Sequence, residues 1–248
     1  SLPESFLATR SARAVAGALR RMRRVTRGDR PTTDGVGRTD ADAWGGYLDD
    51  QTTLDLIAAV EDGAGRGVFS AMAGALSSKG LRILSAETAL VSGGVLLLQY
   101  TAEDPRAATN AAEANRRVGS ITTAMVHAVD SDEPPEMPRV WGADRAEAAA
   151  ALSAKPTEVR IDRDLSDECL IVEVFTVDRV GLLYELARGL HDLGFVIRFA
   201  KIATSLDQVV DVFYLTERDL SKPTGAEREA AIRDRLLTVI SGPIDQAD

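Results

Sequence analysis

The sequence is poor in the side chains that most often build metal sites and disulfides. It holds one cysteine, Cys169, and two histidines, His127 and His191, among 248 residues. A single thiol forms neither an intramolecular disulfide nor a thiolate cage for a metal. Cys169 stands in an apolar run, where we expect a buried, unreactive thiol. This usage is typical of a reducing compartment, and we expect a cytoplasmic protein.

Long apolar runs and aromatic residues are also scarce. The longest apolar run, residues 93–98, is far shorter than the roughly 20 residues that cross a bilayer. Residues 1–5 lack the features of a secretory signal, and no initiator Met precedes them, so we expect a longer natural chain. Aromatics make up 5% of the residues and the net charge is −9, which argues against nucleic-acid binding. We therefore expect neither a membrane nor a nucleic-acid partner.

The first 50 residues differ from this acidic average, because eight arginines lie within the first 30. Apolar residues at helical spacing predict a helix over residues 4–27. We interpret its arginines as a solvated face, with docking on an acidic partner as the alternative. Residues 28–50 are rich in Gly, Asp and Thr and predict a flexible linker, its end held by Trp44 and Tyr47.

An internal repeat organises the rest of the chain. Residues 67–100 align with residues 181–214 at one constant offset, which places residue 67 on residue 181. Identical pairs at this offset include Gly67/Gly181, Leu76/Leu190, Gly80/Gly194, Ile83/Ile197, Ala86/Ala200, Val95/Val209 and Tyr100/Tyr214. These identities at one unbroken offset indicate a duplicated block.

Each copy predicts a strand, a helix, a hairpin of two strands and a second helix. The predicted strands are residues 53–60, 81–90 and 95–101 in the first copy, and 169–177, 195–204 and 209–216 in the second. The first helix of each copy begins near Gly67 or Gly181 and ends at Gly80 or Gly194, where a left-handed residue suits a helix end. The second helices are predicted at residues 105–129 and 225–240.

A further alternating segment, residues 157–162, predicts a strand that closes the first copy as a ferredoxin-like βαββαβ unit. The second copy has no obvious final strand, so its sheet is either three-stranded or completed from elsewhere. Residues 130–155 read as an inserted loop and an Ala-rich helix over residues 145–152. We therefore expect units over residues 51–163 and 164–248, in the α+β class, behind an N-terminal segment of residues 1–50.

Three segments of the second copy resemble an ACT domain. They read Phe-Thr-Val-Asp-Arg-Val-Gly-Leu-Leu-Tyr from residue 175, Gly-Phe-Val-Ile-Arg-Phe-Ala-Lys-Ile-Ala-Thr from residue 194, and Asp-Val-Phe-Tyr-Leu-Thr from residue 211. The first copy is similar but looser. The tandem pair, together with the opening Leu-Pro-Glu-Ser-Phe-Leu of residues 2–7, resembles the C-terminal region of the bifunctional uridylyltransferase/uridylyl-removing enzymes that modify the PII protein.

This resemblance implies two ferredoxin-like βαββαβ (ACT) units that sense an amino acid, with L-glutamine as the expected ligand. It implies regulation of uridylylation and deuridylylation by absent upstream catalytic domains, which alone would use Mg²⁺. The chain itself is then non-catalytic and needs no cofactor, although the full-length protein would be a nucleotidyltransferase. The implied partners are the amino acid, those upstream domains and the PII protein, with ACT units paired within the chain or in a homodimer.

The loop between the first strand and first helix of each copy is the candidate ligand site. A glycine there permits close approach of a ligand, and a helix N-terminus favours a carboxylate. Asp62 and Asp178 could accept hydrogen bonds from an ammonium or amide group, or could merely cap the helix. The set implied by the resemblance is Asp178, Val180, Gly181, Leu182, Leu183, Ala200 and Asp211 in the second copy, and Asp62, Gly67, Val68, Phe69 and Ala86 in the first.

Some of these positions keep a structural alternative. Ala86 and Ala200 suit core packing equally well, and Asp211, in an otherwise apolar strand, faces either solvent or a ligand. The loop between the first strand and the first helix is two residues longer in the first copy than in the second. If one of the two sites has lost its affinity for the ligand, we therefore expect it to be the site of the first copy.

Two other functions remain open. One is a free-standing tandem-ACT regulator that acts through protein contacts. The other is a metal-dependent hydrolase that uses the His191–Asp192 dipeptide. Two observations argue against it: a metal site needs several ligands, and the first copy has two serines at the corresponding positions. No P-loop, nucleophile elbow or nucleotidyltransferase signature is present, so we expect no catalytic residue and no bound metal.

Overall fold

The computed structural model describes residues 20–22, 25, 40–61, 67–91, 94–106, 108, 110–131, 133–138, 157–205 and 208–242 of the chain. Most of the helix predicted over residues 4–27, the helix predicted over residues 145–152, and Asp62 lie outside the described residues.

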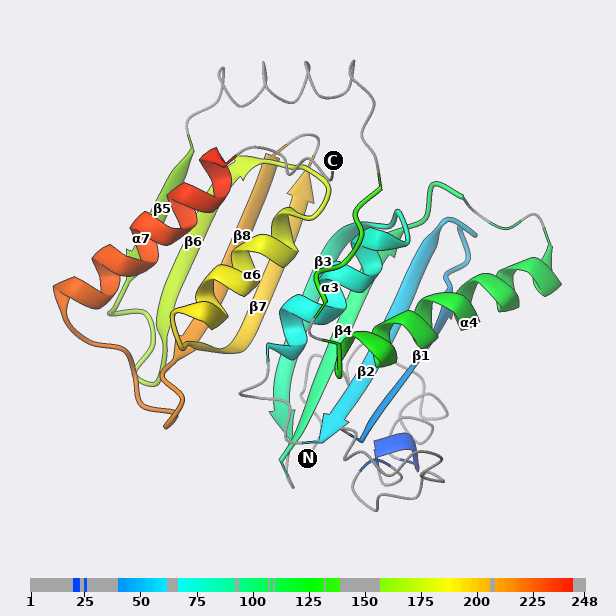
Figure 1. The fold of residues 1–248 in the computed structure, drawn as a ribbon, viewed down its shortest axis with the longest axis horizontal. Helices are drawn as coiled ribbons and strands as arrows, with labels where there is room; N and C mark the ends of the chain where they lie inside the picture. Colours follow the sequence, from blue (N-terminus) through cyan, green and yellow to red (C-terminus); the bar gives the residue numbers. More distant parts are fainter. Residues whose placement is uncertain are drawn as a thin grey trace.

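The first unit is a four-stranded antiparallel sheet with two helices on one face (Figure 1). Its strands lie in the order β1-β2-β4-β3. They are β1 (Ala41–Tyr47), β2 (Thr53–Glu61), β3 (Arg82–Val91) and β4 (Val95–Glu103), and the helices are α3 (Val68–Ser78) and α4 (Ala111–Ala128). One face of the sheet packs on the helices, because alternate residues of β2 and β4 point to that side.

The second unit repeats this layout. Its sheet has the order β5-β6-β8-β7 and is antiparallel throughout. The strands are β5 (Glu158–Asp162), β6 (Leu170–Val177), β7 (Val196–Ser205) and β8 (Gln208–Thr216), and the helices are α6 (Leu182–Asp192) and α7 (Ala226–Ser241). The predicted α+β class with two ferredoxin-like units in tandem is confirmed.

The edge strands come from unexpected segments. Residues 41–47, predicted to be linker, form β1, with Trp44 opposite Ile57. Residues 157–162 do not close the first sheet. Instead β5 pairs with β6 of the second sheet, with Glu158 opposite Phe175. Each unit thus runs ββαββα, and the boundaries expected at residues 50 and 163 both separate an edge strand from its own sheet.

A physical reason for this order is the length of the connections. Residues 48–52 join β1 to β2, and residues 163–169 join β5 to β6. Closing such short loops costs less entropy than returning from the far end of a unit. The free edge of β2 or β6 accepts an antiparallel strand from either direction along the chain, so the preceding segment fills it.

The constant offset of the repeat fails at the hairpin that β3 and β4 form in the first unit and β7 and β8 form in the second. In the sheets Ala86 lies opposite Tyr100, and Ala200 lies opposite Phe213 rather than Tyr214. Three residues separate β3 from β4, whereas two separate β7 from β8. This difference shifts β8 by one residue relative to β4, and a shift of one residue turns a side chain to the other face of the sheet. Tyr100 is therefore buried, and its hydroxyl donates to the carbonyl oxygen of Phe69 at 3.1 Å. The predicted match of Tyr100 with Tyr214 is wrong.

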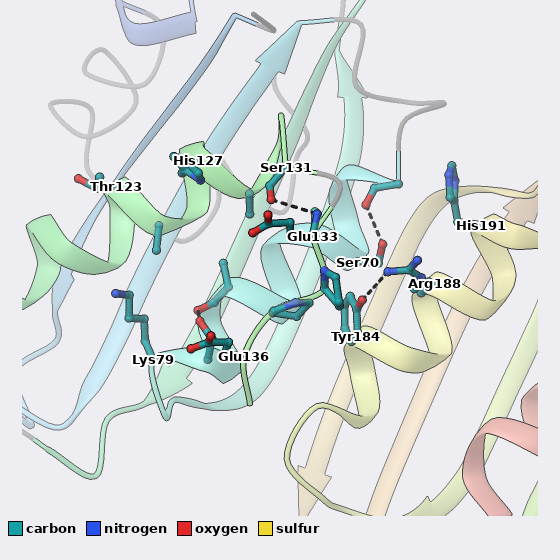
Figure 2. Close-up of a pocket in the computed structure, with 18 of the residues that line it drawn as sticks. Ser70, Lys79, Thr123, His127, Ser131, Glu133, Glu136, Tyr184, Arg188 and His191 are labelled. Atoms are coloured by element: carbon teal, nitrogen blue, oxygen red, sulfur yellow. Dashed lines mark hydrogen bonds between the residues drawn. The ribbon is translucent and has the colours of Figure 1, made fainter. Parts of the chain in front are cut away.

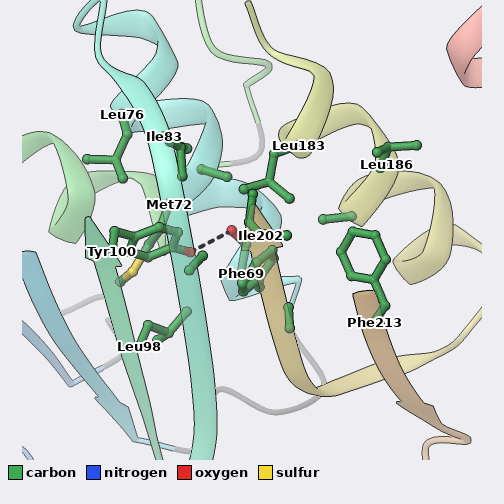
Figure 3. Close-up of a cluster of buried hydrophobic side chains, with 14 of the residues drawn as sticks. Phe69, Met72, Leu76, Ile83, Leu98, Tyr100, Leu183, Leu186, Ile202 and Phe213 are labelled. Carbon is green, nitrogen blue, oxygen red and sulfur yellow. Dashed lines mark hydrogen bonds between the residues drawn. The ribbon is translucent and has the colours of Figure 1, made fainter. Parts of the chain in front are cut away.

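The two units lie side by side, with β3 against β7 and α3 against α6 (Figure 1). One apolar cluster runs through both units, and in Figure 3 Phe69 of the first unit points toward Leu183 and Ile202 of the second. The approach is close at Gly74 of α3, where an added Cβ would lie 2.7 Å from Pro135 and 2.9 Å from Tyr184. The two units are thus packed against each other within the chain.

Residues 20–22 and 25 are helical and cover the outer face of the first sheet. Val25 packs in a buried cluster with Ile57 and Leu97. The Arg21 guanidinium lies 3.0 Å from the Asp42 carboxylate, so this arginine of the basic segment is paired within the chain.

Candidate functional site

A cavity of about 630 Å³ lies between the two units, and we refer to it as the interface cavity. The first unit lines it with the end of α3 and the start of β3. The second unit lines it with residues 178–183, Ile202 and Asp211. Six predicted ligand residues therefore meet in one space: Asp178, Val180, Gly181, Leu182, Leu183 and Asp211. Ala200 is fully buried opposite Phe213 and is not among the residues that line the cavity.

The N-terminus of α6 opens onto this cavity. Gly181 precedes the helix with a φ of 80°, a left-handed conformation that favours glycine. An added Cβ at Gly181 would also lie 3.0 Å from the Met137 side chain. The first turn of a helix presents N–H groups and the positive end of the helix dipole, so this end suits a carboxylate.

Charged groups from both units flank the helix start. The Asp178 carboxylate lies 3.6 Å from Nε of Arg82, which belongs to the first unit. Arg106 of the first unit also lines the cavity. Arg179 points elsewhere, because its guanidinium binds Glu185 and donates to the carbonyl oxygen of Val239 at 3.0 Å. Asp178 therefore contributes its side chain to the cavity, whereas the side chain of Arg179 stabilises the packing of α6 on α7.

Asp211 is the most unusual group in the cavity. Its side chain is buried, and among the described residues its Oδ1 atom has no hydrogen-bond partner. Its neighbours across the sheet are the apolar Val174 and Ile202. Burial, and secondarily the negative charge of Asp178, raise the pKa of Asp211 well above its usual range. The alternative that Asp211 faces solvent is wrong.

The described residues of the first copy do not line the interface cavity as an equivalent set. Val68, Phe69 and Ala86 are buried, and the Phe69 ring packs on Tyr100 with centroids 5.8 Å apart. Gly67 begins α3 with a φ of 68°, but an added Cβ there would meet His191 at 3.1 Å. The sheet position of Asp211 holds Leu98, a fully buried residue opposite Thr88. Among the described residues, the second unit thus supplies the buried acid that lines the interface cavity.

A larger groove of about 830 Å³ runs between α3, α4, α6, Ser131 and residues 133–136 (Figure 2). Figure 2 shows His127 and His191 on opposite sides of it. Asp192 binds Arg235 at 3.1 Å, on the side of α7. In the described part of the chain, no three His, Cys, Asp or Glu side chains gather as metal ligands would. The His191–Asp192 alternative therefore gains no support from this arrangement.

A buried polar network at Asp104 and the environment of Cys169 lie outside the two cavities. Asp104 accepts hydrogen bonds from Arg117 at 2.9 Å and from the Tyr47 hydroxyl at 2.7 Å, which ties α4 to the sheet. Burial and this bond raise the pKa of Tyr47 to about 12. No motif marks this network in the sequence. Cys169 is half-buried rather than buried, and burial raises the pKa of its thiol.

No helix in the described ranges combines the length and the hydropathy needed to cross a bilayer.

Sequence comparison identifies relatives for most of the chain, although no family model matches it. Bifunctional uridylyltransferase/uridylyl-removing enzyme of Azospirillum brasilense is 30% identical over 181 residues, which cover 71% of this chain and 19% of that protein. The same enzyme of Caulobacter vibrioides is 30% identical over 175 residues, covering 71% and 18%. That of Ruegeria pomeroyi is 28% identical over 185 residues, covering 73% and 20%.

The chain spans about one fifth of the length of these relatives. Among solved structures, aspartate kinase from Synechocystis covers 78% of this chain, and 41% of its own chain is matched, with 14% identity and a TM-score of 0.20. That value is too low to support an argument. The sequence matches fall on the C-terminal part of the relatives, so the chain is related to the C-terminal, regulatory part of bifunctional uridylyltransferase/uridylyl-removing enzymes.

Proposed function

We propose that this chain is the amino-acid-sensing region of a PII uridylyltransferase/uridylyl-removing enzyme and that it binds L-glutamine in the interface cavity. The observation that carries this proposal is the meeting of Asp178, the start of α6 at Gly181, and the buried Asp211 in one cavity between two ACT-like units. The chain binds and signals, and catalysis belongs to other domains of the full-length enzyme.

The cavity offers complementary groups for both charged ends of an amino acid. The N-terminus of α6, with Arg82 and Arg106 nearby, suits the α-carboxylate. Asp178 and Asp211 suit the α-ammonium group. Apolar walls such as Leu183 and Ile202 surround these few polar groups, which is the usual composition of a small-molecule site. The volume of about 630 Å³ lies within the range of such sites.

The position of the cavity supplies a physical route to regulation. Its walls come from both units, and the Arg82–Asp178 pair joins the units beside it. A ligand that contacts both units favours whichever relative arrangement gives it the better contacts, and it shifts the population accordingly. Upstream catalytic domains that contact the two units would register this shift as a change between uridylylation and deuridylylation of PII.

The proposal is tested by isothermal titration of the 248-residue chain with L-glutamine, with L-glutamate and D-glutamine as comparisons. We expect saturable binding of one L-glutamine per chain, because in the described part of the chain the buried acid that lines the cavity comes from the second unit. Asp178→Ala should weaken binding by roughly 10-fold or more, the usual effect of losing one charged hydrogen-bond partner. Asp167→Ala, in an exposed loop outside the cavity, is the matched control and should bind normally.

A folded chain that binds no amino acid would contradict the sensor proposal. It would favour the alternative of a tandem-ACT regulator that acts through protein contacts.

A further inference from the structure

Asp211 occupies a position that the fold itself does not require to be acidic. Its side chain is 1% exposed, and its Oδ1 atom lacks a hydrogen-bond partner among the described residues. The first sheet fills the same position with Leu98, which is fully buried. A buried carboxyl group with an unsatisfied oxygen destabilises a protein, whereas a buried leucine would stabilise it. The acid at position 211 therefore points to a role in binding rather than in packing.

The surroundings of Asp211 favour its uncharged form in the empty cavity. From its own sheet it meets the apolar Val174 and Ile202. The loop before α6 adds the negative Asp178, which raises the pKa of Asp211 further. Of the cations near this cavity, Arg82 lies beside Asp178, and Arg179 is bound to Glu185. Arg106, on the side of the first unit, is the remaining cation that lines it.

We propose that the ammonium group of an incoming amino acid takes the place of the proton on Asp211, so that ligand binding releases one proton. This inference rests on the function proposed above. In the step, the O–H bond of the Asp211 carboxyl group breaks and the proton passes to the solvent buffer. The resulting carboxylate accepts a hydrogen bond from the ammonium group, and no other bond changes.

Proton release gives binding a defined dependence on pH. Affinity rises with pH, by at most tenfold per unit, over the range in which Asp211 is protonated in the free chain and ionised in the complex. It levels off once Asp211 is ionised in both states. A ligand that has the carboxylate and the amide but no ammonium group, such as 4-carbamoylbutanoate, should bind at least tenfold more weakly and release no proton.

Two measurements on the 248-residue chain test this inference. The first follows the side-chain carboxyl ¹³C signal of Asp211 in the free chain by NMR, assigned by its loss in Asp211→Asn. We expect this carboxyl group to ionise at a pH above the ordinary carboxyl range. The second titrates L-glutamine at a pH below that ionisation, in buffers of different ionisation enthalpy, so that the slope of the observed heat gives the protons released. We expect a value near one, and a value near zero for Asp211→Asn, which keeps the shape of the side chain.

The outcomes separate the two proposals. If L-glutamine binds without releasing a proton, or if Asp211 in the free chain ionises at the ordinary pH of a carboxyl group, the proton coupling is wrong and the sensor function stands. If neither L-glutamine nor any other amino acid binds, both proposals are wrong. Asp178→Asn should retain a measurable proton release, which would assign the release to Asp211 rather than to the other acid.

Discussion

Replacing Asp211 by leucine should stabilise the chain while it abolishes amino-acid binding. Asp211→Leu removes a buried carboxyl group with an unsatisfied oxygen, which costs about 1–3 kcal/mol. It also buries a leucine side chain, which contributes about 1.5–3 kcal/mol. Imperfect fit of the new side chain costs about 1–3 kcal/mol. The free energy of unfolding should therefore rise by about 2 kcal/mol.

The gain in stability from Asp211→Leu should depend on pH, and the environment of Asp211 determines whether it grows or shrinks as pH rises. The pKa of Asp211 is raised in the folded chain, so in the wild type the folded state loses stability as pH rises above the ordinary carboxyl pKa of about 3.9. The loss grows until the pH reaches the raised pKa of the folded state. Leucine does not titrate, so the advantage of Asp211→Leu over the wild type should be larger at pH 7 than at pH 4.

Urea unfolding followed by circular dichroism at both pH values measures this difference, and the midpoint should rise at unchanged slope. Asp211→Asn is the control, because it keeps an unsatisfied polar group in the same place and should give a much smaller gain at pH 4. A folded Asp211→Leu protein that is less stable than the wild type at pH 7 would refute the reasoning. It would mean that the Asp211 carboxyl group has a stabilising partner in the folded chain.

Two further substitutions test the packing that holds the site. Asp104→Asn should destabilise the chain by about 3 kcal/mol at pH 7, because it breaks the buried pair with Arg117, and thermal unfolding measures the loss. Burial opposes ionisation of Asp104, but the hydrogen bonds that it accepts lower its pKa. The loss of stability caused by Asp104→Asn should therefore shrink as pH falls through that lowered pKa. An equal loss at pH 3 would contradict a stabilising role for the ionised Asp104. Gly74→Ala should destabilise by about 1–3 kcal/mol, because the new methyl group would meet Pro135 at 2.7 Å. Gly119→Ala in α4, where nothing lies within 4 Å, should instead stabilise by about 0.5–1 kcal/mol, and equal effects at the two glycines would contradict the close packing of the units.

The duplicated core could be predicted from the sequence because its signals are local. Helical spacing of leucines and the glycines at helix ends gave the elements of both copies, and Gly80 and Gly194 do adopt positive φ. The edge strands could not be predicted in the same way. Residues 41–47 hold two glycines and few large apolar side chains, so their strand depends on pairing with β2 rather than on their own pattern.

The candidate site was predictable only in part. The second copy carries the loop and glycine that form one wall of the interface cavity, and these residues do come together. The opposite wall, with Arg82 and Arg106, depends on how the two units pack and has no local signature. The burial of Asp211 depends on the register of β8, which a difference of one residue in hairpin length decides.

The most direct test of the central claim is a crystal structure of the 248-residue chain grown with L-glutamine. Our account predicts one ligand per chain in the interface cavity, with its carboxylate at the start of α6 near Gly181 and its ammonium group between Asp178 and Asp211. A ligand bound instead in the groove between α3, α4 and α6, or an empty interface cavity at saturating L-glutamine, would contradict it.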